Sequence, residues 1–522
     1  MPWKKRGELY GILVLLLAVL AIAPLTYPGF FEVESGYLPT FHVQHLSGDA
    51  QGVGDVASPE GEDRLPYLLA WPFLQLTGSG IQAIKWGYGL AFALGALAVY
   101  AWTRQWLGNQ GAVLASVVYT YLPWHLHTVY GRGAYAESWL WALWPVALWA
   151  VDRIAEHRLR SRIAGSLVGL AAMAGAFWTH PGLTALFVPV LVAYDAILNQ
   201  RGRRLAIWLT ASLGLLLAAL RLLAPDASGP SFADSFLAPF QLLSAAWGPA
   251  SSYQLGVASV GLTLVAVALW IARREESATE PGEDPTPAAH LPLNRAFLFW
   301  GIVLAAVLFL TLPLSAPLWK LTAFERFVAW PWQILALAGL PLAYLAGMVI
   351  RASRPLAQPP AWAGLIALVI LASYPYLAPS FTQVDPGPEP AAFFQLTPEK
   401  APTLALLDYQ VAPATEITPT LVLTLTWQTT QPIAEEYTVF VHVLTDDEAK
   451  LAQRDAQPCG GECPTATWRP GEIVVDRHEL ALDGPAVSSI HHLAVGLYLL
   501  DTGERVAIAG RDEPVLRLQV VE

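Results

Sequence analysis

The acidic side chains that could act as a general base gather in one segment, residues 28–80. They are Glu32, Glu34, Asp49, Asp55, Glu60, Glu62 and Asp63. A carboxylate beside a hydroxyl can accept its proton while the oxygen attacks another group. Glu32 and Glu34 flank a single valine, and their hard oxygen ligands could also help to hold a divalent cation. The competing interpretation is a solvated acidic loop without chemistry.

A second group of side chains could bind an anion. Arg132 lies in the stretch 130–137, which reads YGRGAYAE, and a guanidinium there could clamp a phosphate. Glu137 ends this stretch, and it could equally pair with Arg132 and only hold two helices together. Both interpretations of the pair stay open at the level of sequence.

Two further positions are candidates for substrate binding. His42 and His45 are three residues apart and would share one face of a helix, as ligands or as ordinary polar packing. Arg326 belongs to a cluster with Lys320 and Glu325 just before Trp-Pro-Trp at 330–332. No metal site is predicted from these residues.

The elements that must position these residues are predicted to be membrane helices. Of the 522 residues, 55% are hydrophobic and 14% are charged, whereas soluble proteins carry about 25% charged residues. About eleven apolar runs are long enough to cross a bilayer. They are residues 8–27, 81–103, 111–130, 137–154, 163–178, 182–198, 205–224, 254–272, 296–314, 327–350 and 362–378. The run at 65–76 is too short to span and is expected to be an interfacial or re-entrant helix.

The loop charges predict an orientation for these helices. Lys4, Lys5 and Arg6 precede the first run and place the N-terminus in the cytoplasm. The arginines at 104, 153–162, 201–204, 273–274 and 351–354 then fall on the same side. An odd number of spans puts the C-terminus outside, with the long first loop, 28–80. A cleaved signal peptide competes for the first run, but its length and Pro24 favour a retained anchor.

A different composition begins after residue 379. A proline-rich linker is expected over 380–400, which separates the membrane domain, 1–379, from a second domain, 401–522. Alternating β-branched runs at 420–428, 437–444, 473–482, 493–500 and 515–521 predict an all-β sandwich of about eight strands. Cys459 and Cys463 lie in this domain, where a disulfide, free thiols or a metal ligand pair are all open. A location outside the cytoplasm favours the disulfide.

Several functions are excluded or disfavoured by the same sequence. A net charge of −11 argues against nucleic acid as a partner. Phosphate-loop and zinc-protease motifs are absent, and the G-x-G-x-x-A at 131–136 would join two membrane helices instead of a strand and a helix. A transporter is disfavoured because the spans hold almost no charge at mid-membrane depth.

Three stretches of the chain carry a resemblance to a known family. They are residues 28–46 (PGFFEVESGYLPTFHVQHL), 129–137 (VYGRGAYAE) and 324–335 (FERFVAWPWQIL). Together with the strand-like sequence at 437–443, 464–473 and 495–505, these stretches resemble the bacterial multi-pass families related to GT-C fold glycosyltransferases. These include the 6-pyruvoyl-tetrahydropterin-synthase-related membrane proteins with an attached β-sandwich.

This resemblance implies a transferase in the bacterial plasma membrane that uses a polyprenyl-phosphate-linked sugar on the outer face. It implies an essential acid in the first outer loop, for which Glu34 is the first candidate and Glu32 the second. Arg132 would contact the carrier phosphate, with Glu137, His42 and Arg326 as further binding candidates. The alternative is a non-catalytic envelope or polysaccharide-assembly protein whose sandwich binds glycan or protein. The sugar, the acceptor and the oligomeric state do not follow from the sequence.

Overall fold

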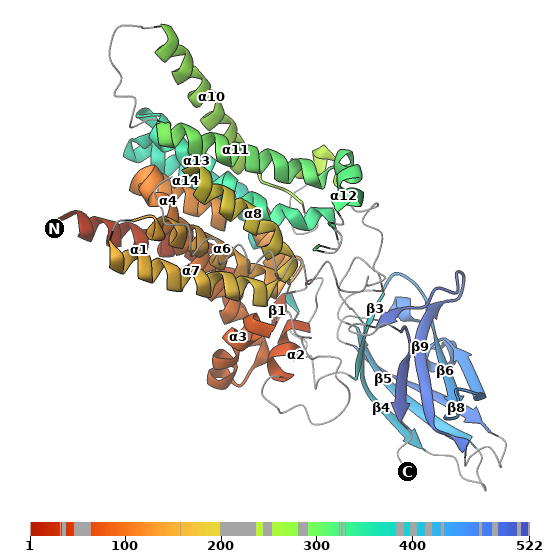
Figure 1. The fold of residues 1–522 in the computed structure, drawn as a ribbon. Helices are drawn as coiled ribbons and strands as arrows, with labels where there is room; N and C mark the ends of the chain where they lie inside the picture. Colours follow the sequence, from red (N-terminus) through yellow and green to blue (C-terminus); the bar gives the residue numbers. More distant parts are fainter. Residues whose placement is uncertain are drawn as a thin grey trace. The chain divides into compact units, whose positions relative to one another are not determined.

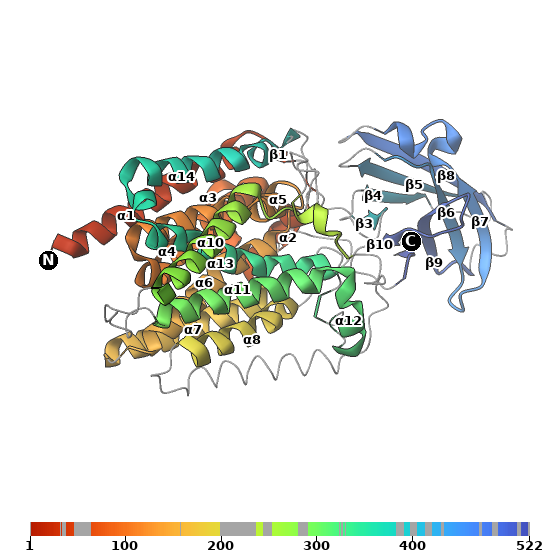
Figure 2. The same ribbon diagram turned by 90° about the horizontal axis from the view of Figure 1, so that it is seen from above.

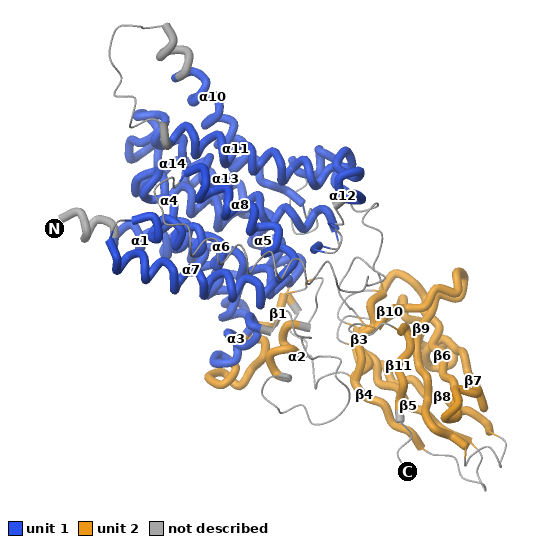
Figure 3. The backbone as a smooth tube through the Cα atoms, viewed as in Figure 1, with its two compact units in different colours: residues 1–27, 61–73, 84–379 blue, residues 28–60, 74–83, 380–522 orange. Residues whose placement is uncertain are grey.

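A computed structural model of the 522-residue chain shows a helical part followed by a strand-rich part (Figure 1). The residues it describes are 2–31, 33, 38–45, 64–156, 158–198, 236–243, 253–279, 291–322, 324, 327–328, 330–379, 381–382, 391–396, 404–412, 420–429, 433–468, 472–482, 489–508 and 513–519. The chain forms two compact units, one of residues 1–27, 61–73 and 84–379 and the other of residues 28–60, 74–83 and 380–522 (Figure 3). We call them the helical unit and the strand unit.

Within the described residues, seven helical segments are long and apolar enough to cross a membrane. They are Glu8–Thr26, Gly80–Thr120, Leu159–Thr179, Pro181–Leu198, Leu293–Thr311, Pro331–Ala352 and Pro359–Leu377. The corresponding elements are α1 (Pro2–Ile22) with η1 (Ala23–Thr26), α4 (Gly80–Thr120), α7 (Leu159–Thr179), α8 (Pro181–Leu198), α11 (Leu291–Thr311), η7 (Pro331–Ala338) with α13 (Gly339–Ala352), and α14 (Pro359–Ser373) with η9 (Tyr374–Leu377). The chain is therefore a multi-pass membrane protein.

The expected count of about eleven spans differs from these seven for identifiable reasons. The run at 81–103 and the first half of that at 111–130 fall in α4, which is interrupted at Gly108, where φ is +71°. The run at 205–224 lies outside the described residues. The run at 254–272 forms α10 (Val257–Thr279), whose apolar part is shorter than the seven. The run at 137–154 forms α6 (Tyr135–Ile154), which is not among the seven. The total number of spans stays a prediction.

Shorter helices occupy the stretches that join these segments. The apolar stretch at 65–76 forms α3 (Arg64–Thr77), 14 residues with Pro72 inside. α5 (Pro123–Tyr130) and α6 (Tyr135–Ile154) follow α4, and α6 packs along α7. A Cβ atom at Gly165 would lie 2.9 Å from the Ala150 carbonyl oxygen, so α7 can approach α6 this closely only with glycine there.

Besides a two-stranded pair, the strand unit contains two larger antiparallel sheets (Figure 2). One has the order β10-β3-β4-β5-β8, with β3 (Ala392–Gln395), β4 (Leu404–Ala412), β5 (Thr420–Thr429), β8 (Ile473–Ala481) and β10 (Ala507–Ile508). The other has the order β11-β9-β6-β7, with β6 (Tyr437–Leu444), β7 (Lys450–Ala456), β9 (His492–Leu499) and β11 (Leu516–Gln519). All five predicted strand runs are confirmed as strands; the sandwich arrangement stays a prediction.

The residues that link the two predicted domains also carry regular structure. β2 (Phe381–Thr382) pairs with β1 (Phe30–Phe31), and β3 begins at Ala392 inside the stretch predicted as a linker. Strand pairing between residues about 350 positions apart is a long-range contact that composition cannot signal. The domain boundaries themselves stay predictions.

One hydrophobic cluster contains side chains from both larger sheets. Two polar residues of β8 are buried within it. The inward positions of β8 are Val474, Asp476, His478 and Leu480, since Asp476 pairs with Leu425 and His478 with Leu423 across β5. Asp476 and His478 are fully buried, and His478 Nε2 lies 2.7 Å from Asp476 Oδ2. The other carboxylate oxygen accepts the Cys459 backbone N–H at 2.8 Å.

This carboxylate ties a cross-linked loop to the sheet. A disulfide joins Cys459 and Cys463, whose Cα atoms are 5.4 Å apart. The indole N–H of Trp468 donates to the Cys463 carbonyl oxygen at 2.9 Å, which holds the other end of the loop. Trp427 and Trp468 are buried in the cluster, so their rings are not surfaces for a sugar.

Replacing Asp476 by alanine is expected to loosen this loop and β8 together. The substitution leaves two buried donors without their acceptor, at a cost of about 2–5 kcal/mol. Hydrogen exchange of residues 458–463 and 473–481 in the full chain in detergent should accelerate by about tenfold or more. Glu479→Gln, on the exposed face of the same strand, is the control and should change exchange little. Equal exchange in both variants would contradict the role given to Asp476.

Candidate functional site

The turn between α5 and α6 fixes the position of Arg132. The backbone N–H groups of Gly131 and Arg132 both donate to the His127 carbonyl oxygen at 2.8 Å, and that of Ala134 donates to Thr128 at 2.9 Å. These bonds end α5 and satisfy its last carbonyl groups. Gly133 has a φ of +68°, which favours glycine and lets the chain enter α6 at once.

Arg132 and Glu137 form a two-pronged ion pair across this turn. Arg132 Nη1 lies 2.7 Å from Glu137 Oε2, and Nη2 lies 2.8 Å from Oε1. Their side chains are only 11% and 8% exposed. The planar match of guanidinium and carboxylate is the strongest form of charge-assisted hydrogen bonding, and it fixes the orientation of both groups.

Aromatic rings enclose the guanidinium. The Arg132 Cζ atom lies 4.6 Å from the centre of the Trp332 ring and 5.5 Å from that of Trp124. Trp330 stacks on Trp332 at 5.4 Å, and Tyr253 contacts both Trp124 and Trp332. Cation–π contacts of this kind strengthen when the cation is shielded from water. Three segments far apart in the sequence therefore meet around one cation: α5, the residues before α10, and η7.

The helical unit also contains a buried lysine on α4 and a close contact between two tyrosines. Neither was predicted from the sequence. Lys85 is 1% exposed, and its ammonium donates to the Tyr27 carbonyl oxygen. Tyr88, one turn later, packs edge-on against Tyr135 with ring centres 4.9 Å apart. Gly87 allows this approach, because a Cβ there would lie 2.0 Å from the Tyr135 hydroxyl. A cation inside an apolar run is itself a signal of function, and it could have identified Lys85.

The other end of α6 carries a second polar group that the sequence did not indicate. Asp152 is buried, and the Tyr194 hydroxyl on α8 donates to its carboxylate at 3.0 Å. The indole N–H groups of Trp102 and Trp106 on α4 both donate to the Tyr194 oxygen at 3.0 Å. These bonds tie α4, α6 and α8 together, which is a structural role.

The structure describes some of the predicted site residues and not others. It brings Arg132 and Glu137 together. Glu32, Glu34 and Arg326 lie outside the described residues, so their roles stay predictions. His42 lies in α2 (Leu38–His45) and is partly buried, with His45 at the end of the same helix.

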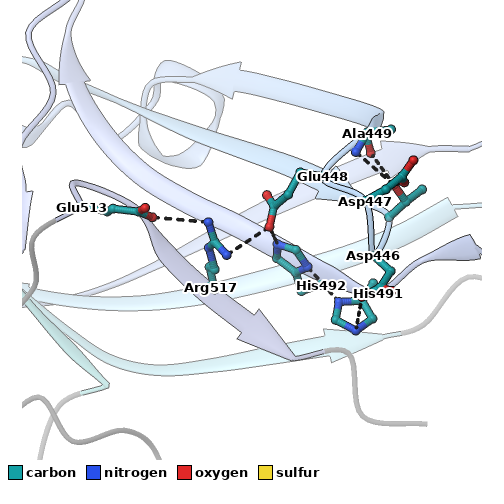
Figure 4. A network of polar contacts seen from close by, with 9 residues as sticks. Asp446, Asp447, Glu448, Ala449, His491, His492, Glu513 and Arg517 are labelled. Atoms are coloured by element: carbon teal, nitrogen blue, oxygen red, sulfur yellow. Dashed lines mark hydrogen bonds and ion pairs between the residues drawn. The ribbon is translucent and has the colours of Figure 1, made fainter.

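A polar network on the strand unit groups further ionisable side chains (Figure 4). Arg517 bridges Glu448 at 3.0 Å and Glu513 at 3.3 Å, and His492 Nε2 lies 3.6 Å from Glu448. The Thr445 hydroxyl donates to Asp447 and lowers the pKa of that carboxyl. Among the residues that the structure describes, no three His, Cys, Asp or Glu side chains are grouped to hold a metal ion.

Comparisons with known proteins add little beyond this geometry. No protein-family model and no curated protein matches the chain. Among solved structures, it is similar to the crystal structure of ArnT from Cupriavidus metallidurans bound to undecaprenyl phosphate, with 18% identity over 70% of this chain. The match covers 63% of that structure's chain, less than two thirds, at a TM-score of 0.38. A likeness this weak establishes neither a family nor an activity.

The Arg132–Glu137 pair is expected to show strong energetic coupling. Glu137→Gln alone should lower the free energy of unfolding by about 3–5 kcal/mol, because it removes the carboxylate that is bonded to a buried cation. The double variant R132Q/E137Q should lose less than the sum of the two single variants. Unfolding of the full chain in detergent measures this cycle.

The partly exposed pair Arg153–Glu156, at the other end of α6, is a matched control, since Arg153 also lies over a tryptophan ring, that of Trp149. Its coupling should stay within about 1 kcal/mol. Additive effects at Arg132 and Glu137 would show that the enclosed pair has no special role.

Proposed function

We propose that the chain is a membrane glycosyltransferase of the GT-C type that moves a sugar from a polyprenyl-phosphate carrier to an acceptor hydroxyl on the outer face of the membrane. The observation that carries this proposal is the fixed cation at the α5–α6 turn. Arg132 is oriented by Glu137 and enclosed by Trp124 and Trp332, so its position at the end of α5 is fixed.

The reaction assigns one role to each group. Glu34, with Glu32 in reserve, takes the proton from the acceptor hydroxyl, as the family resemblance implies. The acceptor oxygen then attacks the anomeric carbon, the bond from that carbon to the phosphate oxygen breaks, and the configuration inverts. The polyprenyl phosphate leaves with the electron pair, and Arg132 stabilises its charge. A divalent cation held by the two glutamates stays a proposal, as do His42 and Arg326 as binding residues.

Membrane placement supports the same function. The carrier's lipid tail stays in the hydrocarbon while its sugar reaches water, so the site must lie at a helix end, as Arg132 does. We propose the bacterial plasma membrane, with the N-terminus in the cytoplasm and a C-terminal β-sandwich domain outside. A proline-rich linker over 380–400 would join that domain, 401–522, to the membrane domain, 1–379.

A second candidate function is a non-catalytic envelope or polysaccharide-assembly protein. One observation favours it: both terminal nitrogens of Arg132 donate to Glu137, which neutralises the charge that a phosphate would meet. Binding of the polyprenyl-phosphate carrier distinguishes the two candidate functions.

The double variant R132Q/E137Q is expected to weaken binding of a polyprenyl phosphate by about 10–100-fold. It keeps the approximate shapes of both side chains and removes both charges of the pair. Arg153→Gln, with the same kinds of partners at the other end of α6, should bind like the wild type. Binding of the lipid to purified protein in nanodiscs measures both. Equal affinity of all three proteins would remove Arg132 from the carrier site.

Glu34→Gln is expected to slow sugar transfer by about 10²–10⁴-fold without changing carrier affinity, because it removes only the proton acceptor. A panel of polyprenyl-phosphate sugars with the purified protein supplies the assay. Full activity of Glu34→Gln would overturn the base assignment. No transfer by the wild type from any donor of the panel, with the carrier still bound, would favour the second candidate.

A further inference from the structure

Two short apolar segments flank the ends of α10 and α11 and leave large side chains uncovered. One is η4 (Pro239–Leu242) with Leu243, and the other is η5 (Pro313–Ser315) with α12 (Ala316–Thr322). We call them together the apolar rim. Phe240 is 72% exposed, Leu314 77% and Leu321 83%. Removing such side chains from water is favourable in free energy.

The rim is a fixed part of the helical unit. On α12, Trp319 is fully buried, its indole N–H donates to the Leu310 carbonyl oxygen at 2.9 Å, and its ring packs against Phe236. This anchor holds α12 with Trp319 inward while Leu321 points outward. The exposure of Leu321 is therefore built into the fold.

Hydrogen bonds attach the rim to the ends of two apolar helices. The Leu237 N–H donates to the carbonyl oxygen of Thr311, the last residue of α11, at 2.9 Å. The Leu255 N–H donates to Leu242 at 3.1 Å, two residues before α10 begins. Both segments therefore lie at one end of this helix pair.

The exposed side chains and charges of α10 and α11 indicate what surrounds the apolar rim. α11 exposes Ile302 and Phe309 along its apolar length, and the exposed Leu314 follows directly. The opposite ends of the same two helices carry the exposed cations Arg273 and Arg295. The uncovered apolar surface of a membrane-length helix thus continues into the rim, at the end away from these charges.

We propose that the apolar rim is immersed at the boundary between lipid headgroups and acyl chains, as an interfacial element outside the seven spans. Short apolar segments with one outward face bind a bilayer in this way. The rim is also attached close to the Arg132 site, because Tyr253 lies two residues before Leu255 and contacts Trp124 and Trp332. Immersion of the rim would fix that site near headgroup depth, whether or not it transfers a sugar.

Spin labelling of the full chain in liposomes tests this placement. The sequence has two cysteines, both in the disulfide, so a single introduced cysteine is the only thiol. We would attach a nitroxide at F240C and at L321C and compare its collision rates with oxygen and with a water-soluble nickel chelate. Ile302→Cys, on the exposed face of α11, is the lipid reference, and Leu500→Cys, an exposed leucine of the strand unit, is the second reference.

The expected result is an oxygen-to-nickel collision ratio at both rim positions that is several-fold above that of L500C and below that of I302C, which lies in the middle of a membrane-length helix. A ratio at either rim position as low as that of L500C would overturn the proposal, because it would place that segment in water. The measurement needs no activity, so its result is independent of the proposed transfer reaction.

Discussion

The paired charges of Arg132 and Glu137 are the constraint on which the helical unit depends. Neither charge would be stable alone in so buried a position, and together they satisfy each other through two short hydrogen bonds. Their enclosure requires that α5, η7 and the residues before α10 meet at one place. The glycines of the turn and the tryptophans of η7 and α5 are the means by which this sequence achieves it.

Polar groups at its two ends fix α6. The Arg132–Glu137 pair lies at its start, and the contact of Asp152 with Tyr194 lies at its end. Between them, close packing against α7 leaves the helix little freedom.

The sequence predicted what is local and missed what is long-range. Apolar runs identified the membrane helices, and alternation identified the strands, because both patterns repeat over a few residues. The closeness of Arg132 and Glu137 was foreseen for the same reason, since only five positions separate them. The contact of Arg132 with Trp332, the pairing of β1 with β2, and the hydrogen bond from Lys85 to Tyr27 join distant positions, and no periodic pattern encodes them. Asp476 and His478 are exceptions to the alternation of apolar and polar residues, because they occupy inward positions of β8 where an apolar side chain is expected.

An experimental structure of the full chain with a non-transferable polyprenyl phosphonate would test the central claim most directly. Our account predicts that the phosphonate oxygens lie within hydrogen-bonding distance of the Arg132 guanidinium, with the lipid tail running into the hydrocarbon. A bound phosphonate elsewhere, with Arg132 still closed between Glu137 and the two tryptophan rings, would show that this pair only holds the helices together.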